Sequence, residues 1–291
     1  MSVPIRSVLV ASDLTESSDE VLQAAKQVAA FAGAELHVVH VQEPIYPLYP
    51  AGETVVDMQK RLHEASDKLN EQLQRTGTSD AVKSSRIEFG SSSREILKRG
   101  KEVGADLIVI GPHQQRRVGD RLLGTTADRL IRSSEVPCLI VRGPISLPLR
   151  RVLMATDFSD PAQLALREAF EWAVGLGAQS AGEGAVELKV VHVLQLVGEF
   201  GTAGLQDQLA KVLHEQVEAA RKQVSGGESV RVEEEVLQHS SASGAIVRLA
   251  ASGMDLLVLA THGRTALGRA LIGSVASTVS REVECPVLLV P

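Results

Sequence analysis

The amino-acid sequence contains one pattern written twice, and this internal repeat limits the fold more than any other feature. The segment VLVASDLTESSDEVLQAA (8–25) corresponds to VLMATDFSDPAQLALREA (152–169). Near the end of each copy, GTTADRLIRSSEVPCLIV (124–141) corresponds to GSVASTVSREVECPVLLV (273–290). Pro144 and Pro148 lie between the copies and favour an extended linker. We therefore predict two tandem domains, residues 1–147 and residues 148–291.

Within each copy, short β-branched runs alternate with amphipathic helical stretches. In the first copy this pattern predicts strands at 5–11, 35–41, 82–89, 106–111 and 137–141, and helices near 17–32, 54–75, 92–103 and 124–134. Runs such as LIVI and LLVL are apolar at every position, which is typical of parallel strands buried on both faces. The predicted fold class is α/β, with two tandem doubly wound domains, each a five-stranded parallel sheet flanked by helices (Rossmann-like).

The composition excludes some classes of binding partner and indicates the cellular location. A net charge of −6 disfavours nucleic acid and anionic membranes, and an aromatic content of 3% disfavours stacking on single-stranded nucleic acid. No apolar stretch approaches the roughly 20 residues that span a bilayer. The first ten residues lack the layout of a signal peptide, so we expect a cytoplasmic protein. Two cysteines, Cys138 and Cys285, are too few for a disulfide framework or a metal cluster, and we expect buried, unreactive thiols.

Small residues, with Gln114 as the exception, follow the fourth predicted strand of both copies, where ligands of doubly wound sheets bind. The second copy has Ala260, Gly263, Gly273 and Ser274, and the first copy has Gly111, Gln114, Gly124 and Thr125 at the corresponding positions. A glycine just past a strand lets a ligand approach the backbone, and the N–H groups at a helix N-terminus attract an anion. The pattern predicts a phosphate-binding loop, although neither G-x4-G-K-[ST] nor G-x-G-x-x-G occurs.

These motifs together resemble the tandem universal stress proteins, and the resemblance covers nearly all of both copies. Nucleotide-binding members carry G-x2-G-x9-G-[ST] after strand 4, an Asp at the end of strand 1 and His-Val at the end of strand 2. The resemblance implies that the Asp contacts the nucleoside, that backbone at His-Val reads adenine, and that the glycine motif holds ribose and phosphates. The implied ligand residues are Asp157, Val193, Ala260, His262, Gly263, Gly273, Ser274 and Val275 in the second copy, and Asp13, Val41, Gly111, Gly124 and Thr125 in the first.

Both copies depart from the family motif. Ala260 adds one methyl group in the second copy, whereas Gln114 places a bulky side chain where the first copy should present backbone to phosphate. We therefore expect the second copy to be the better nucleotide site. In an alternative that stays open, Arg116, Arg117 and Arg121 let the first copy bind a triphosphate by charge.

Several of these residues also have a purely structural interpretation. Asp13 and Asp157 could organise the turn or cap the following helix, but Thr15-Glu16 and Asp160-Pro161 are better helix starts and would leave both aspartates for a ligand. For His40 and His192, at the strand ends, packing is favoured over catalysis. Asp13, His40 and His113 lack a recognised ligand spacing, so no protein metal site is predicted, and Mg²⁺ would enter with a triphosphate.

The sequence thus favours a cytoplasmic ATP-binding sensor or regulator of the stress response. The resemblance further implies pairing of the two copies through their last strands and dimerisation of the whole chain. No poised general base or nucleophile elbow is evident, so efficient catalysis is not expected and enzymatic activity stays open. Two alternatives remain: an interaction scaffold that has lost nucleotide binding, and a slow Mg²⁺-dependent ATP hydrolase.

Overall fold

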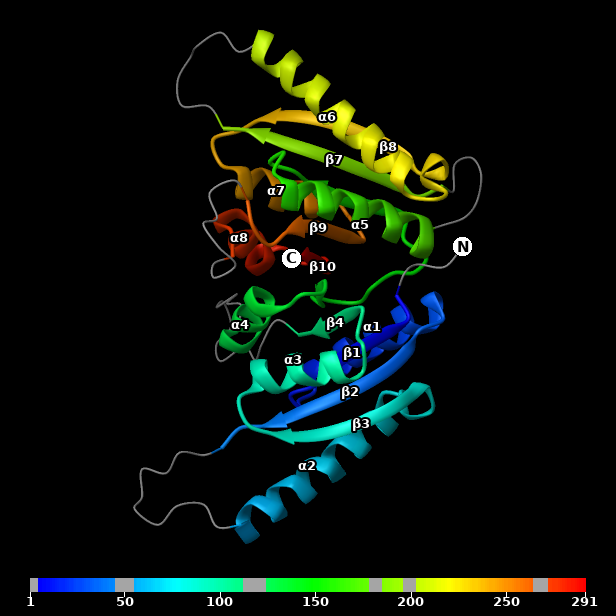
Figure 1. The fold of residues 1–291 in the computed structure, drawn as a ribbon, viewed down its shortest axis with the longest axis vertical. Helices are drawn as coiled ribbons and strands as arrows, with labels where there is room; N and C mark the ends of the chain where they lie inside the picture. Colours follow the sequence, from blue (N-terminus) through cyan, green and yellow to red (C-terminus); the bar gives the residue numbers. More distant parts are fainter. Residues whose placement is uncertain (1–4, 45–54, 112–123, 178–184, 196–202, 264–271) are drawn as a thin grey trace.

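The computed structural model describes residues 5–44, 55–111, 124–177, 185–195, 203–263 and 272–291. The first repeat runs β1 (Ser7–Ala11), α1 (Ser17–Ala32), β2 (Glu35–Gln42), α2 (Val55–Arg75), β3 (Val82–Phe89), α3 (Ser92–Glu102), β4 (Leu107–Ile110), α4 (Thr125–Ser133) and β5 (Cys138–Ile140). The second repeat runs β6 (Arg151–Ala155), α5 (Asp160–Leu176), β7 (Glu187–Leu194), α6 (Ala203–Gln223), β8 (Arg231–Gln238), α7 (Ala242–Ala250), β9 (Leu256–Ala260), α8 (Ser274–Glu282) and β10 (Val287–Val290). Figure 1 shows the two repeats stacked along the long axis of the molecule.

All the named strands belong to one ten-stranded sheet with the order β3-β2-β1-β4-β5-β10-β9-β6-β7-β8. Within each repeat the neighbouring strands are parallel, as in the pairing of Val8 with Leu36 and of Val152 with Leu188. The predicted α/β fold, with a doubly wound sheet of five parallel strands in each repeat, is confirmed. The helices and strands of the first repeat begin and end within two residues of their predicted bounds.

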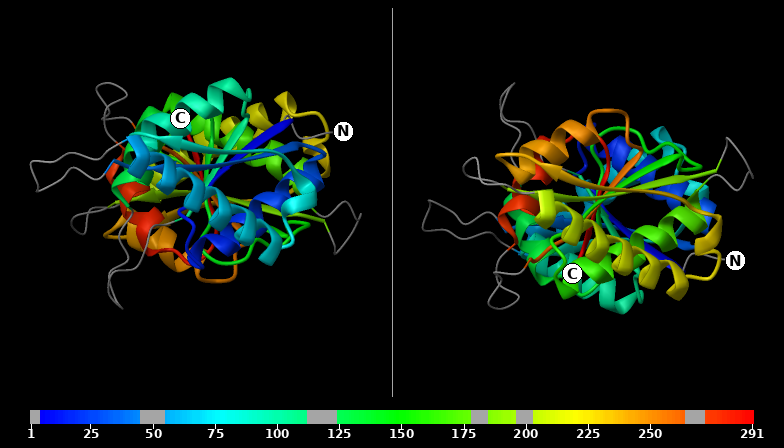
Figure 2. Two further views of the ribbon diagram at one scale, coloured as in Figure 1. Left: turned by 90° about the horizontal axis from the view of Figure 1, so that it is seen from below. Right: turned by 90° about the horizontal axis from the view of Figure 1, so that it is seen from above.

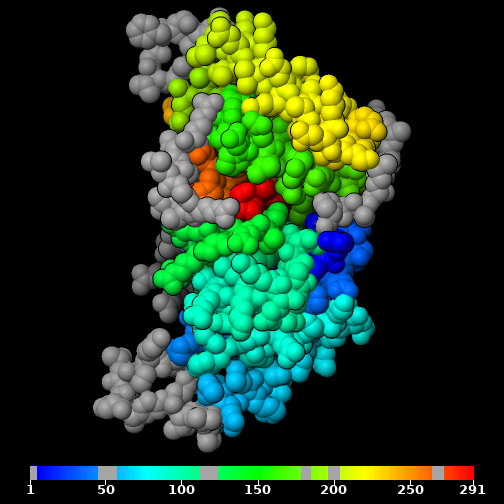
Figure 3. All heavy atoms as spheres, viewed as in Figure 1, coloured from blue at the N-terminus to red at the C-terminus, as the bar shows by residue number. Residues whose placement is uncertain are grey.

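The two repeats meet through their last strands. β5 and β10 are antiparallel, with Leu139 opposite Leu288 and Cys138 opposite Leu289. The C-terminal strand therefore lies in the middle of the molecule, where Figure 3 shows its red atoms between the first repeat and the rest of the second. The pairing through the last strands, which the family resemblance implied, is confirmed.

Two apolar cores lie on opposite faces of this sheet, and each one extends through both repeats. The first contains buried residues of α1, α2, α5 and α6, and the second contains buried residues of α3, α4, α7 and α8. Neighbouring strand residues alternate between them, since Val8 and Val10 belong to the first core and Leu9 to the second. Seen along the long axis, helices cover the twisted sheet on both sides (Figure 2).

The two cysteines are free thiols. Burial raises the pKa of the Cys138 thiol to about 12 and that of Cys285 to about 11, so neither is a nucleophile near neutral pH. In the described part of the chain, no helix combines the length and the apolar character needed to cross a membrane.

Candidate functional site

A cavity of about 370 Å³ lies at the carboxyl ends of β1, β2 and β4 in the first repeat. This volume falls within the usual range of small-molecule sites. Four of the five residues expected here line the cavity, namely Asp13, Val41, Gly111 and Thr125. The fifth, Gly124, is the N-cap residue of α4 directly before Thr125. Residues from four separate segments of the first copy therefore meet at one place.

The walls of this cavity differ in chemistry. Its apolar side is formed by Val39, Ile96, Ile110 and Leu130. Its polar lining consists of the hydroxyl groups of Ser12, Ser17, Ser18, Ser92, Thr125 and Thr126 together with the carboxyl groups of Asp13 and Glu43. Such a cavity suits a ligand with one flat apolar part and one part rich in hydroxyl or phosphate oxygens.

Asp13 organises the turn between β1 and α1. Its Oδ1 accepts hydrogen bonds from the backbone N–H of Thr15 at 3.0 Å, from Thr15 Oγ1 at 2.6 Å and from Ser18 Oγ at 2.5 Å. Leu14, at the centre of this turn, has a φ of 63°. Helix α1 begins at Ser17 after Glu16, which makes no side-chain cap. The expectation that Thr15 and Glu16 would leave Asp13 without a turn role is therefore wrong.

The second repeat builds the same turn with different residues. Asp157 Oδ1 accepts a hydrogen bond from the backbone N–H of Ser159 at 3.0 Å, and Phe158 has a φ of 64°. Helix α5 begins at Asp160, with Ser159 Oγ accepting a hydrogen bond from the N–H of Ala162 at 3.3 Å. Asp160 is thus a helix start, as predicted, but Asp157 also serves the turn.

A histidine joins the ends of the first two strands in each repeat. Nδ1 of His40 lies 2.8 Å from the carbonyl oxygen of Ser12, and Nδ1 of His192 lies 2.8 Å from that of Thr156. Because the partner is a carbonyl, Nδ1 donates. Burial lowers the pKa of His40, which favours its neutral form. His192 also stacks on Phe158, with 4.2 Å between ring centroids. Both histidines therefore have the packing role that the sequence favoured.

The departure from the motif at Ala260 has a packing explanation. A Cβ placed on Gly111 would lie 3.1 Å from Cγ2 of Val21 in α1, so the first repeat has little room for a methyl group there. In the second repeat the counterpart of Val21 is Ala165, which is smaller. The extra methyl of Ala260 is therefore matched by a smaller residue on the helix that faces it.

The glycine loop of the second repeat closes on the turn that carries Asp157. A Cβ on Gly263 would lie 2.6 Å from Oδ2 of Asp157, so any larger residue would force the loop or the carboxylate to shift. The N–H of Gly273 donates to the carbonyl oxygen of Thr261 at 2.8 Å, which draws the two ends of the loop together. Nδ1 of His262 bonds the hydroxyl of Thr261 at 2.7 Å, and its buried Nε2 has no hydrogen-bond partner among the described residues.

The two helices that follow the glycine motifs begin alike. Gly124 and Gly273 are the N-cap residues of α4 and α8, and neither start has a side-chain cap. The first N–H groups of an uncapped helix attract an anion. Ser274 is exposed and Val275 half-buried in the first turn of α8. Val193 is half-buried near the end of β7, the position that Val41 holds in β2.

Glu43 was not found by sequence analysis. Its Oε1 accepts hydrogen bonds from the N–H of Ser92 at 3.1 Å and from Ser92 Oγ at 2.7 Å, at the start of α3. These bonds lower the pKa of the Glu43 carboxyl. No motif marks this residue, because its role depends on the end of β2 meeting the start of α3.

Part of the predicted loop of the first copy lies outside the described residues. This applies to His113, Gln114, Arg116, Arg117 and Arg121. Within the described ranges, no three His, Cys, Asp or Glu side chains are grouped so that they could hold a metal ion.

Comparison with known proteins covers both repeats. The profile of the universal stress protein family matches residues 4–142 and again residues 148–291. A universal stress protein of Mycolicibacterium smegmatis is 25% identical, over 97% of this chain and 96% of that protein. Universal stress protein A homolog 2 of Coxiella burnetii is 31% identical over 47% of this chain and 94% of its own length. The crystal structure of a universal stress protein from Archaeoglobus fulgidus superposes with a TM-score of 0.71, at 21% identity, covering 98% of this chain and 95% of that one.

Proposed function

This chain belongs to the universal stress protein family, and from that premise we propose that it binds an adenine nucleotide and acts as a sensor or regulator in the stress response. ATP is the proposed nucleotide, with Mg²⁺ carried by its phosphates. The observation that carries the proposal is the cavity of about 370 Å³ at the carboxyl ends of β1, β2 and β4, beside the start of α4. Doubly wound sheets bind their ligands at this edge.

The two kinds of wall fit the two parts of a nucleotide. The apolar wall of Val39, Ile96, Ile110 and Leu130 suits the base, next to the backbone of Val41. The hydroxyl-bearing wall suits the ribose, and the uncapped start of α4 suits a phosphate. Asp13 holds its turn through Oδ1 and lines the cavity, so a structural role and a ligand role are compatible.

The second repeat is proposed to be the better site. Its support is the loop in which Gly263 approaches Asp157 and Gly273 bonds Thr261, which brings backbone N–H groups to the start of α8. Nε2 of His262, which has no hydrogen-bond partner among the described residues, supports a polar ligand at this loop. Dimerisation of the whole chain and a cytoplasmic location stay predictions from the resemblance.

A matched pair of variants tests both sites in the full-length protein. Thr126→Trp and Val275→Trp occupy equivalent positions in the first turns of α4 and α8, where an indole would fill the space beside the helix start. Lys211→Trp, on the exposed side of α6, is the control. We expect calorimetric titration with Mg-ATP to detect binding by the wild type, with each of these two tryptophan variants losing one site and Val275→Trp losing the tighter one.

The alternatives predict different results. A wild-type chain that binds no ATP at millimolar concentration would favour the scaffold. Loss of the tighter site in Thr126→Trp, with Val275→Trp unaffected, would assign the better site to the first repeat. Steady-state hydrolysis faster than about 1 s⁻¹ would instead favour an enzyme.

A further inference from the structure

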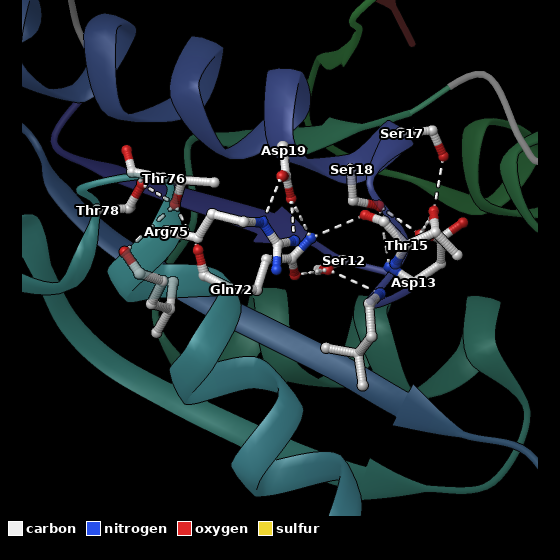
Figure 4. A network of polar contacts seen from close by, with 12 residues as sticks. Ser12, Asp13, Thr15, Ser17, Ser18, Asp19, Gln72, Arg75, Thr76 and Thr78 are labelled. Carbon is white, nitrogen blue, oxygen red and sulfur yellow. Dashed lines mark hydrogen bonds and ion pairs between the residues drawn. The ribbon is translucent and has the colours of Figure 1, made fainter.

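Helix α2 contacts residues that line the first-repeat cavity at two separate places. Near its C-terminal end, Gln72 reaches the turn between β1 and α1, and Arg75 reaches Asp19 in the first turn of α1 (Figure 4). Earlier in the helix, Nη2 of Arg61 donates a hydrogen bond to the carbonyl oxygen of Glu43 at 3.0 Å. Glu43, just after β2, and the turn residues Ser12 and Asp13, just after β1, line the cavity. One helix thus bonds two separate segments of the cavity wall.

Gln72 is the central residue of the contact with the turn, and its side chain is only 1% exposed. Its Oε1 accepts a hydrogen bond from Ser12 Oγ at 2.6 Å. Its Nε2 donates to the carbonyl oxygen of Thr15 at 2.9 Å and to Asp19 Oδ1 at 2.8 Å. A buried amide with both ends engaged fixes the groups that it bonds, because breaking any bond would leave a buried polar atom without a partner.

The bonds continue from Gln72 to the backbone on either side of Asp13. Ser12 Oγ accepts a hydrogen bond from the N–H of Leu14 at 3.0 Å. Gln72 therefore fixes the hydroxyl that supports the left-handed backbone conformation of Leu14. Arg75 makes a bidentate contact with Asp19, with both N–O distances at 2.9 Å, and this contact lowers the pKa of the Asp19 carboxyl. Asp19 in turn holds the amide of Gln72. Asp13 therefore lies in a segment whose two ends are tied to α2.

The second repeat lacks these side chains. Helices α2 and α6 have the same length of 21 residues. At the positions of Arg61, Gln72 and Arg75, helix α6 carries Leu209, Ala220 and Gln223. The turn itself is kept, since Thr156 Oγ1 accepts a hydrogen bond from the N–H of Phe158 at 3.0 Å. An alanine at position 220 has no polar atom with which to bind that turn.

We propose that α2 braces both of these wall segments of the first-repeat cavity through Arg61 and Gln72, so that ligand binding in the first repeat is coupled to the order of α2, whereas the second repeat has no such coupling. This inference rests on the proposed nucleotide binding. Gln72 is a positioning residue, because it acts on Ser12 and the Asp13 turn without lining the cavity itself. Coupling is reciprocal, so a ligand that needs the ordered turn also stabilises α2.

The test compares Gln72→Ala with Asn70→Ala, an exposed position on the same helix. Ala220 shows that the fold accepts alanine at the equivalent position of α6. Mg-ATP affinity of the first repeat is measured in the Val275→Trp background, and that of the second repeat in the Thr126→Trp background. Loss of the hydrogen bonds of Gln72 should weaken first-repeat binding about tenfold and leave second-repeat binding unchanged, while Asn70→Ala alters neither.

Hydrogen exchange provides a second readout that a purely structural role of Gln72 would not move. In the wild-type chain, Mg-ATP should slow amide exchange in α2 but not in α6, and Gln72→Ala should abolish the slowing in α2. Equal first-repeat affinity in Gln72→Ala and wild type, or an equal fall at both repeats, overturns the coupling. The coupling is also overturned if the first repeat binds no Mg-ATP while the second repeat does. A wild-type chain that binds no ATP at either repeat overturns the proposed function itself.

Discussion

At the scale of single residues, Gly263 has little room for a side chain. A methyl group at this position would lie 2.6 Å from Oδ2 of Asp157, whose other oxygen is held by the N–H of Ser159. Either the loop or the carboxylate must move, and overpacking of this kind costs about 1–3 kcal/mol. We expect Gly263→Ala to lower the free energy of unfolding in urea by this amount and to weaken Mg-ATP binding by the second repeat.

The control for this substitution is Gly204→Ala in the first turn of α6, where a Cβ would have no atom within 4 Å. Gly204→Ala should leave the urea midpoint unchanged or raise it, because alanine favours a helix. Equal midpoints for Gly263→Ala and wild type would show that the loop does not pack on Asp157.

The sequence identified some of these residues and could not identify others. Asp13, Val41, Gly111 and Thr125 were predicted because each stands at a recognisable position in a motif, and the fold brings them to one cavity. Their ligand roles stay predictions. Glu43 and Gln72 were missed, because each acts through a contact between elements that are far apart in sequence. The turn roles of Asp13 and Asp157 were misjudged, because a helix start three or four residues later does not release the preceding carboxylate.

At the scale of elements, the alternation of apolar runs was enough to find the helices and strands of the first repeat, since burial on both faces of a parallel sheet leaves a local signal. Charged residues inside such elements are harder to interpret. Glu168 lies on α5, a helix whose buried face includes Trp172 and Phe170. Burial, together with the nearby charge of Glu171, raises the pKa of Glu168 to about 7, and Arg167 offsets part of this effect.

This shift gives α5 a pH dependence with a defined sign. The folded state holds the Glu168 proton more tightly than the unfolded state, where the ordinary pKa is 4.5. The contribution to stability is therefore complete below pH 4.5 and is lost as the pH rises towards about 7. Glu168→Gln, which stays neutral, should match the wild type near pH 4.5 and exceed it at pH 8 by about 1–2 kcal/mol, less than the full shift implies because the side chain keeps some contact with water.

Urea unfolding at the two pH values provides the measurement, with Glu20→Gln as the control on an exposed position of α1. A stabilisation by Glu168→Gln of the same size at both pH values would contradict the assignment, because it would not depend on ionisation.

At the scale of the whole molecule, the two apolar cores each contain residues of both repeats. Leu22 of α1 and Trp172 of α5 are 0% and 1% exposed and belong to the same core. Trp172 is the only tryptophan of the chain, so its fluorescence reports on the second repeat. Leu22→Ala should destabilise the protein by about 2–5 kcal/mol and move the urea midpoint of Trp172 fluorescence to lower concentration.

Circular dichroism, which senses the helices of both repeats, should give the same midpoint as Trp172 fluorescence in wild type and variant. The repeats would unfold independently if Leu22→Ala left the urea midpoint of Trp172 fluorescence unchanged and circular dichroism showed a separate transition at lower urea concentration.

The antiparallel seam between β5 and β10 has a consequence for how the two halves change over time. In a dimer of separate identical chains, every mutation arrives twice, once on each side of the symmetry axis. Here the two repeats are parts of one chain, so a mutation in β5 is not repeated in β10. The seam is accordingly asymmetric, with Cys138 opposite Leu289. One repeat can then acquire a residue such as Gln72 while the other keeps Ala220. The two repeats can therefore specialise separately and still remain paired.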